Sequence, residues 1–207
     1  MKNMLTTKYS IIVFDLGNVL IPFDHNKWIE RLNKVEQGLG EKYYRLYMEN
    51  YNVHRSYEAG QMSDEEFIDR NLKWIDYKIT SNDFCEIFSN IFTVNTNVVK
   101  LLPKLKKNYK LVLLSNTNNV HKKYGWEKYK FLKNFDKLIL SHEIGAVKPE
   151  KKIYKAVELY TREPGEKHIF IDDIKEYVAA AKQLGWDGIQ FTDYENLLQE
   201  FKKRKIL

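Results

Sequence analysis

The sequence has little cysteine and no long apolar run. Cys85 is the only cysteine among 207 residues, which excludes an internal disulfide. It lies in a stretch with helical periodicity, where we expect a packed, unreactive thiol. No segment approaches the roughly 20 apolar residues of a membrane-spanning helix. Asp15 interrupts the N-terminal apolar run, and no small-residue cleavage site follows it. We therefore expect a cytoplasmic protein that does not span a membrane.

Internal repeats and low-complexity linkers are also absent. The chain is long enough for one sizeable core, or for a core domain with a smaller inserted unit. It has 34 Lys and Arg against 28 Asp and Glu, a net charge of +6, which suits an anionic ligand. We interpret the basic stretches at 104–110 and 202–205 as solvated surface, and expect no nucleic-acid partner. The sequence does not set the oligomeric state.

The most informative stretch is residues 11–18, which read IIVFDLGN. Four apolar residues, three of them β-branched, indicate a buried strand that ends at Asp15. Ligands of open α/β sheets bind outside the carboxyl ends of the strands, so Asp15 is placed for chemistry. Taken alone, it could equally be a carboxylate that caps a turn.

Residues 21–96 change character and favour helices throughout. Apolar residues recur at helical spacing in four groups. A capping box, Ser63 to Glu66, predicts that the third helix begins at Ser63, with reciprocal bonds between the side chains and backbone N–H groups of the two residues. The groups are Trp28, Ile29 and Leu32; Tyr43, Leu46, Tyr47 and Tyr51; Ile68, Leu72 and Ile75; and Phe84, Ile87, Phe88 and Ile91.

From Val98 onward, helical and strand patterns alternate. The expected strands are 111–114, 138–140, 168–171 and 188–191, and the expected helices are 98–107, a Tyr- and Lys-rich segment before 138, 153–160, 178–184 and one from Tyr194. Gly185 marks a helix stop. This alternation predicts an α/β fold, with a parallel sheet covered by helices on both faces. Residues 1–20 and 97–207 would form this core, and 21–96 a helical domain inserted after the first strand.

Polar side chains follow four of the predicted strands. Asp15 follows the first, Ser115-Asn116-Thr117 the second, Lys148 lies in the loop after the third, and Asp172-Asp173 follows the fourth. Singly, these residues have structural explanations: Ser115 and the Asp pair could cap helices, and Lys148 could be a surface lysine before Pro149. Because parallel strands bring their carboxyl ends to one edge, we expect the residues to form one site.

The chemistry of this set is consistent with phosphoryl transfer. Asp15, Asp172 and Asp173 would repel one another unless a hard cation such as Mg²⁺ lay among them, and the carbonyl of Gly17 could add an oxygen ligand. Lys148 and Ser115 suit a phosphate group. A carboxylate ionised at neutral pH can attack phosphorus once the negative charges are neutralised.

These residues resemble the four motifs of the haloacid dehalogenase superfamily of phosphohydrolases, in order and over nearly the full chain. The matching segments are 14–20 (FDLGNVL), 114–117 (LSNT), 148–150 (KPE) and 171–173 (IDD). The insert is similar to the helical cap of that superfamily, whose core is Rossmann-like. Within the superfamily, the motif sequences most resemble those of bacterial sugar-phosphate phosphatases similar to α-D-glucose-1-phosphatase.

The resemblance implies a Mg²⁺-dependent phosphatase that acts on a small phosphorylated metabolite through an aspartyl-phosphate. It makes Asp15 the nucleophile, Ser115, Asn116 and Lys148 the phosphate-binding residues, and Asp173 a direct metal ligand supported by Asp172. Asn18 belongs to the same first motif and is a further candidate for the phosphate site. In the cap, the segment 57–60 is similar to one that faces substrate, and we expect substrate contacts from Arg55, Tyr57 and Glu58.

The sequence departs from the superfamily pattern at two positions. Gly17 stands where most phosphatases of the superfamily carry a second Asp, which protonates the leaving oxygen and later activates water. General acid–base help of this kind contributes about 10²–10⁴ in rate, so we expect a substitute, with Asp24 and His25 the nearest candidates. Tyr177 stands where the resemblance leads us to expect Asn, near the outer shell of the metal site.

Three other functions stay open at this stage. A dehalogenase of the same superfamily would use the Asp nucleophile without a metal, but the Asp172-Asp173 pair is hard to accommodate without a cation. A catalytically idle protein that binds a phosphorylated metabolite would explain Gly17. Nucleic-acid binding would use the lysines near Tyr109.

Overall fold

The computed structural model describes residues 7–207 and contains a five-stranded parallel sheet. The strand order is β3-β2-β1-β4-β5. The central strand is therefore the one that carries Asp15 at its end. The strands are β1 (Ile11–Phe14), β2 (Lys110–Ser115), β3 (Lys137–Leu140), β4 (His168–Asp172) and β5 (Asp187–Gln190).

Helices cover both faces of the sheet. Since side chains of a strand alternate between its two faces, neighbouring residues of β1 pack against different helices. Ile12 and Phe14 of β1 pack with residues of α6 (Thr96–Val99), α7 (Leu102–Leu105) and α11 (Tyr194–Lys203). Ile11 and Val13 face the other side, with residues of α9 (Lys151–Thr161) and α10 (Lys175–Gln183). The α/β class expected from the sequence is confirmed.

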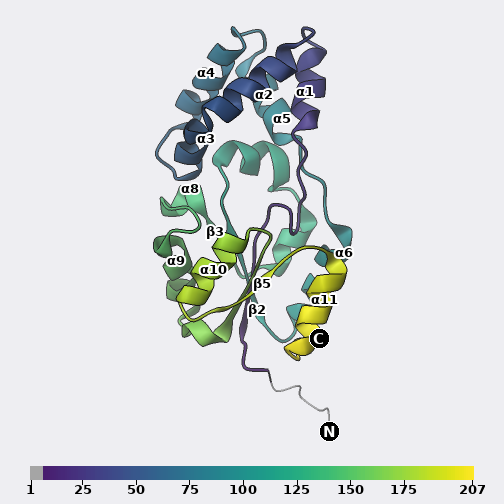
Figure 1. Ribbon diagram of the computed structural model, residues 1–207, viewed down its shortest axis with the longest axis vertical. Helices are drawn as coiled ribbons and strands as arrows, with labels where there is room; N and C mark the ends of the chain where they lie inside the picture. The colour runs from purple at the N-terminus through teal and green to yellow at the C-terminus, as the bar shows by residue number, and fades with distance from the viewer. Residues whose placement is uncertain (1–6) are drawn as a thin grey trace.

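The insert consists of helices, as predicted. They gather at the end of the elongated molecule opposite the C-terminus (Figure 1) and enclose an aromatic-rich apolar cluster that includes Trp28, Tyr43 and Phe67 and, from outside the insert, Val120. We propose from this separate cluster that residues 21–96 form a cap domain on a core of 1–20 and 97–207. The helices are α1 (Asn26–Asn33), α2 (Leu39–Glu49), α3 (Tyr51–Glu58), α4 (Asp64–Trp74) and α5 (Ser81–Ser89).

Several local expectations need correction. Tyr51 does not continue the second helix but begins α3. Residues 98–107 form the separate helices α6 and α7, since Pro103 has no N–H to donate to the carbonyl of Val99. The capping box is half formed: the Glu66 N–H donates to Ser63 Oγ at 3.2 Å, but the Glu66 carboxylate accepts from Arg70 instead.

The Tyr- and Lys-rich segment is not a regular α-helix. It forms the π-helix η1 (His121–Trp126) and the 3₁₀ helix η2 (Lys130–Asn134), and a short helix α8 (Ser141–Ile144) follows β3; the 3₁₀ turn η3 (Gly165–Lys167) precedes β4. η1, teal in Figure 1, lies against α5 of the insert. Gly125 permits this approach, because a Cβ there would meet Ser89 O at 2.9 Å. No helix within 7–207 is long and apolar enough to cross a membrane.

Candidate active site

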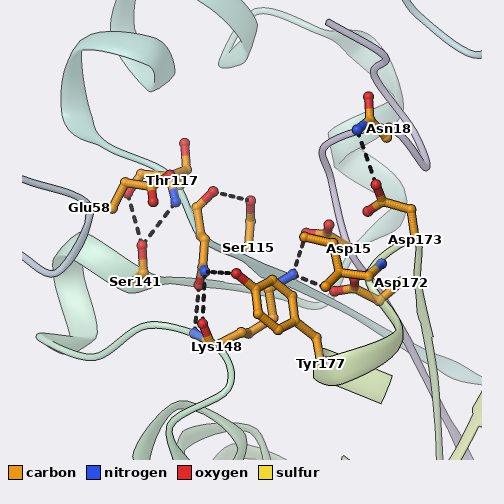
Figure 2. A network of polar contacts seen from close by, with 12 residues as sticks. Asp15, Asn18, Glu58, Ser115, Thr117, Ser141, Lys148, Asp172, Asp173 and Tyr177 are labelled. Atoms are coloured by element: carbon orange, nitrogen blue, oxygen red, sulfur yellow. Dashed lines mark hydrogen bonds and ion pairs between the residues drawn. The ribbon is translucent and has the colours of Figure 1, made fainter. Parts of the chain in front are cut away.

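Strand register brings the acidic residues together at the carboxyl edge of the sheet. Phe14 of β1 pairs with Ile171 of β4, and the Asp15 N–H donates to the Ile171 carbonyl at 2.9 Å. The next residues, Asp15 and Asp172, therefore lie side by side on adjacent strands. Ser115 ends β2 on the other side of β1. The residues that the sequence placed at four strand ends do meet at one edge (Figure 2).

A buried lysine lies between two of the carboxylates. Lys148 Nζ is 2.7 Å from Asp15 Oδ1 and 2.6 Å from Asp172 Oδ2, and the lysine is only 1% exposed. Asp172 is fully buried, and its second oxygen accepts from the Ile174 N–H at 2.8 Å. Figure 2 shows this ammonium linking the ends of β1 and β4. Lys148 is therefore not the surface lysine of the alternative explanation.

Asp173 completes an acidic cluster that can hold a divalent cation. Asp15, Asp172 and Asp173 each offer one carboxylate oxygen, and these oxygens lie within 4.8 Å of one another. The half-buried Asp173 faces the cleft, and its Oδ2 accepts from Asn18 Nδ2 at 3.1 Å. An all-oxygen donor set of this kind fits Mg²⁺.

Burial governs the ionisation of this cluster. Burial raises the pKa of Asp15 to about 8, although Lys148 acts in the opposite direction. Burial also raises the pKa of Asp173. For Lys148, burial alone would lower the pKa, but Asp15 and Asp172 outweigh it and raise the pKa above its ordinary value. The lysine is therefore charged at neutral pH, and positive charge near Asp15 favours the ionised nucleophile.

Asn116, Tyr177 and Arg55 hold the backbone and the ammonium of Lys148 in place. Asn116 Oδ1 accepts from the Lys148 N–H at 2.7 Å, and Asn116 Nδ2 donates to the Lys148 carbonyl at 3.2 Å. Arg55 of α3 donates to the same carbonyl at 3.2 Å. The ring of Tyr177, the second departure from the family pattern, lies with its centroid 5.1 Å from Lys148 Nζ. Asn116 therefore has a positioning contact that its predicted role did not include.

The cap residues named from the sequence occupy different environments. Arg55 and Glu58 line the cavity that holds Asp15, Lys148 and Asp173, and Arg55 pairs with Glu58 at 3.3 Å. Tyr57 lines neither this cavity nor the one beside it. Its ring stacks on Phe67 and its hydroxyl donates to Asp64 at 2.6 Å. The geometry thus gives Tyr57 packing and hydrogen-bonding partners away from the cleft.

Two adjoining cavities lie between the insert and the sheet edge. The catalytic cavity, about 140 Å³, contains Asp15, Lys148 and Asp173, and the second, about 120 Å³, contains Ser115, His25 and η1 residues. We call the second cavity the aromatic chamber. The residues that line both are Gly17, Phe23, Tyr51, Glu58 and Asn116.

The two candidates for the missing acid differ in position. His25 lines the aromatic chamber together with Gly17 and stacks on Trp28. Burial, with a contribution from His54, lowers the pKa of His25 to about 4. Asp24 is exposed, lines neither cavity, and accepts from the Asn26 N–H at 2.9 Å. Of the two, only His25 borders the cleft.

Sequence reasoning missed three residues of the chamber wall: His54, His121 and Trp126. The spacing of His54 and Glu58, four residues apart on a helix, could have drawn attention to the first. No sequence pattern pointed to His121 and Trp126, because the sequence did not predict a π-helix.

Comparisons with known proteins agree with this geometry. The chain is 26% identical over 189 residues to the D-ribitol-5-phosphate phosphatase of Bacteroides thetaiotaomicron, covering 86% of this chain and 90% of that protein. A solved haloacid dehalogenase family enzyme of the same organism, in complex with magnesium and inorganic phosphate, has a TM-score of 0.78 and 27% identity, covering 91% of this chain and 98% of that one.

A more distant structure shares the fold alone. The L-2-haloacid dehalogenase of Xanthobacter autotrophicus has a TM-score of 0.63 and 18% identity, over 96% of this chain and 84% of that one. The sequence profile of "Haloacid dehalogenase-like hydrolase" matches residues 12–191, most of the chain. The chain therefore belongs to the haloacid dehalogenase-like hydrolases.

Proposed function

We propose that this hydrolase is a magnesium-dependent phosphatase of sugar-phosphate-type metabolites that passes through an aspartyl-phosphate. The observation that carries the proposal is the contact of Asp15 with the buried Lys148 ammonium, beside an acidic pair and at the floor of a cleft. The 26% identical relative, named as a D-ribitol-5-phosphate phosphatase, supports the substrate class. A cytoplasmic location stays a prediction.

In this proposal, Asp15 attacks the phosphorus of the bound ester. An Asp15 oxygen forms the new bond to phosphorus, the bond from phosphorus to the ester oxygen breaks, and the leaving alcohol takes up a proton. Water then hydrolyses the acyl phosphate, which regenerates the Asp15 carboxylate and releases inorganic phosphate. Lys148 neutralises charge between Asp15 and the phosphate, and the Ser115 hydroxyl and Asn116 amide bind phosphate oxygens.

Asp15, Asp173 and the carbonyl of Gly17 would hold Mg²⁺, supported by Asp172. The bound ion neutralises negative charge on the phosphate. Asn18 fixes Asp173 through its 3.1 Å hydrogen bond, so that Asp173 keeps its orientation toward the cleft.

Magnesium dependence provides the first test. Purified protein is assayed with a panel of sugar phosphates, sugar alcohol phosphates and p-nitrophenyl phosphate, with Mg²⁺ or with EDTA. We expect phosphate release that EDTA lowers by about 10²-fold or more and added Mg²⁺ restores, since charge stabilisation of this kind contributes several kcal/mol.

The alternatives give different results in the same assay. Release of chloride from 2-chloropropionate in EDTA would favour a dehalogenase. A folded protein that binds Mg²⁺ and phosphate esters without turning them over would favour an idle binding protein. Salt-dependent binding to nucleic acid without phosphatase activity would favour the third alternative.

His25 is the proposed substitute for the acid–base residue absent at Gly17. Because its imidazole is neutral at pH 7, it suits proton uptake from the attacking water better than protonation of the leaving oxygen. We expect His25→Asn to lower kcat about 10²-fold and to accumulate phosphoenzyme in rapid-quench experiments. Asp24→Asn is the matched control, and equal rates in both variants would contradict the assignment.

Gly17→Asp tests the same question by restoring a carboxylate at position 17. A Cβ at this position would meet only the Phe23 ring, at 3.5 Å, so the side chain can be accommodated. If the missing acid at position 17 limits the rate, the variant should hydrolyse esters of poor leaving groups faster than the wild type. A slower variant with unchanged folding would show that the enzyme does not need an acid there.

A further inference from the structure

The aromatic chamber has a polar wall that the proposed mechanism does not use. The insert supplies His54 of α3, and η1 supplies His121 and Trp126. The Glu127 N–H donates to the Lys122 carbonyl five residues earlier, as in a π-helix. His121 and Trp126, five residues apart on η1, both line this cavity.

One polar atom of each ring has no hydrogen-bond partner among residues 7–207. The three atoms are His54 Nδ1, His121 Nε2 and Trp126 Nε1. The residues are 6%, 9% and 1% exposed, so bulk water does not supply hydrogen bonds to these atoms. An unpaired polar atom at such a depth is destabilising, and folded proteins retain few of them. All three atoms belong to residues that line one cavity.

Neighbouring contacts establish what His121 offers. The Asn118 Oδ1 accepts from the His121 backbone N–H at 2.9 Å, which turns Asn118 Nδ2 toward His121 Nδ1, 3.3 Å away. Since Nδ2 can only donate, Nδ1 accepts, and the ring proton is on Nε2. The unpaired Nε2 of His121 is therefore an N–H donor.

Trp126 and His54 carry the other two unpaired ring nitrogens. Trp126 Nε1 can only donate. His54 Nε2 lies 3.3 Å from Glu58 Oε1 and donates toward that carboxylate, while Nδ1 of the same ring has no partner among residues 7–207. Glu58 is ionised, because His54 and Arg55 lower its pKa despite its burial. The chamber is thus lined by three residues with unpaired ring nitrogens, two of which, His121 Nε2 and Trp126 Nε1, are donors.

We propose that His54, His121 and Trp126 bind the hydroxyl groups of the substrate's carbon chain and select polyhydroxylated phosphate esters. A hydroxyl both donates and accepts, so a chain that carries several of them matches this set. Its C–H groups would pack on Tyr47 and Phe92, which also line the chamber. The proposal rests on the proposed phosphatase function, which places the phosphate between Asp15 and Lys148 of the catalytic cavity and Ser115 of the chamber.

Matched esters test the hydroxyl requirement in the wild-type enzyme. A pentitol 5-phosphate, a hexose 6-phosphate and n-pentyl phosphate are all primary alkyl esters, but only the first two carry hydroxyl groups. We expect kcat/KM for at least one hydroxylated ester to exceed that for n-pentyl phosphate by about 10³-fold or more, since unpaired buried groups penalise the alkyl chain strongly. The ratio between the first two distinguishes an open-chain from a cyclic ligand.

Trp126→Phe tests the assignment to particular residues. It removes the N–H while keeping an aromatic ring, and we expect kcat/KM for the preferred hydroxylated ester to fall about tenfold more than that for n-pentyl phosphate. His121→Phe should act in the same direction. Trp186→Phe is the matched control, because Trp186 is buried elsewhere and its N–H donates to Glu158 at 2.8 Å.

Each result has a defined meaning, with folding checked by thermal unfolding. If His121→Phe does not fold, Trp126→Phe decides. Equal rates on n-pentyl and hydroxylated esters, or parallel losses on both in Trp126→Phe, overturn the chamber proposal and leave the phosphatase in place. A wild-type enzyme that hydrolyses none of these esters, nor p-nitrophenyl phosphate, overturns the proposed function itself.

Discussion

Asp15→Asn is expected to lower kcat by about 10⁴-fold or more, since loss of a nucleophile removes the covalent route altogether. The amide has nearly the shape of the carboxylate but does not attack phosphorus. Rates on p-nitrophenyl phosphate and on the best substrate of the panel give the measurement. Asp24→Asn serves as the control, because it makes the same change on an exposed residue outside both cavities.

The variant should fold as well as the wild type. Burial raises the pKa of Asp15 to about 8, which means that the folded protein disfavours its charged form. A neutral amide avoids this desolvation, and Lys148 keeps its 2.6 Å contact with Asp172. We therefore expect an unchanged or higher Tm. Activity within tenfold of the wild type, in a preparation free of contaminating enzyme, would remove Asp15 from the mechanism.

Lys148→Met is the second substitution with a large expected effect. It leaves Asp15 and Asp172 buried without their shared cation, and breaking a buried ion pair in this way destabilises proteins by about 3–5 kcal/mol. Urea unfolding at pH 8 in EDTA measures the loss. We also expect kcat to fall by about 10²–10³, as for other groups that stabilise charge in a transition state. A variant as stable as the wild type would contradict the pairing.

The pH dependence of this loss follows from Asp15. Without the ammonium, the pKa of Asp15 in the folded protein rises further above its value in the unfolded chain, near 4. A raised pKa means that the folded state holds its proton more tightly, so stability falls as pH rises through the folded-state value. The deficit of Lys148→Met should therefore shrink toward pH 4. Adding Asp15→Asn should restore part of it.

The sheet and its acidic edge could be predicted because short-range patterns determine them. The β-branched run before Asp15 favours a strand, and parallel strands bring their carboxyl ends together whatever their distance in sequence. The positions of Ser115 and Asp172 followed from the same rule. Helix bounds were less secure: Pro103 divides a segment that apolar spacing alone predicts as one helix.

The rest of the cleft depends on contacts between distant segments. Tyr57 and Glu58 are neighbours in sequence, yet one packs on Phe67 while the other faces the catalytic cavity. Periodicity locates a helix face but does not state what packs on it. His121 and Trp126 reach their cavity through a π-helix, whose wider turn has no apolar period that distinguishes it from an α-helix.

The position of η1 has a consequence for engineering new specificity. His54 enters the chamber from the inserted helices, whereas His121 and Trp126 come from the chain that follows β2. A chimera that exchanges residues 21–96 with those of another member of the family would therefore transplant only part of the proposed recognition surface. Transfer of substrate preference would require the exchange of η1 together with residues 21–96.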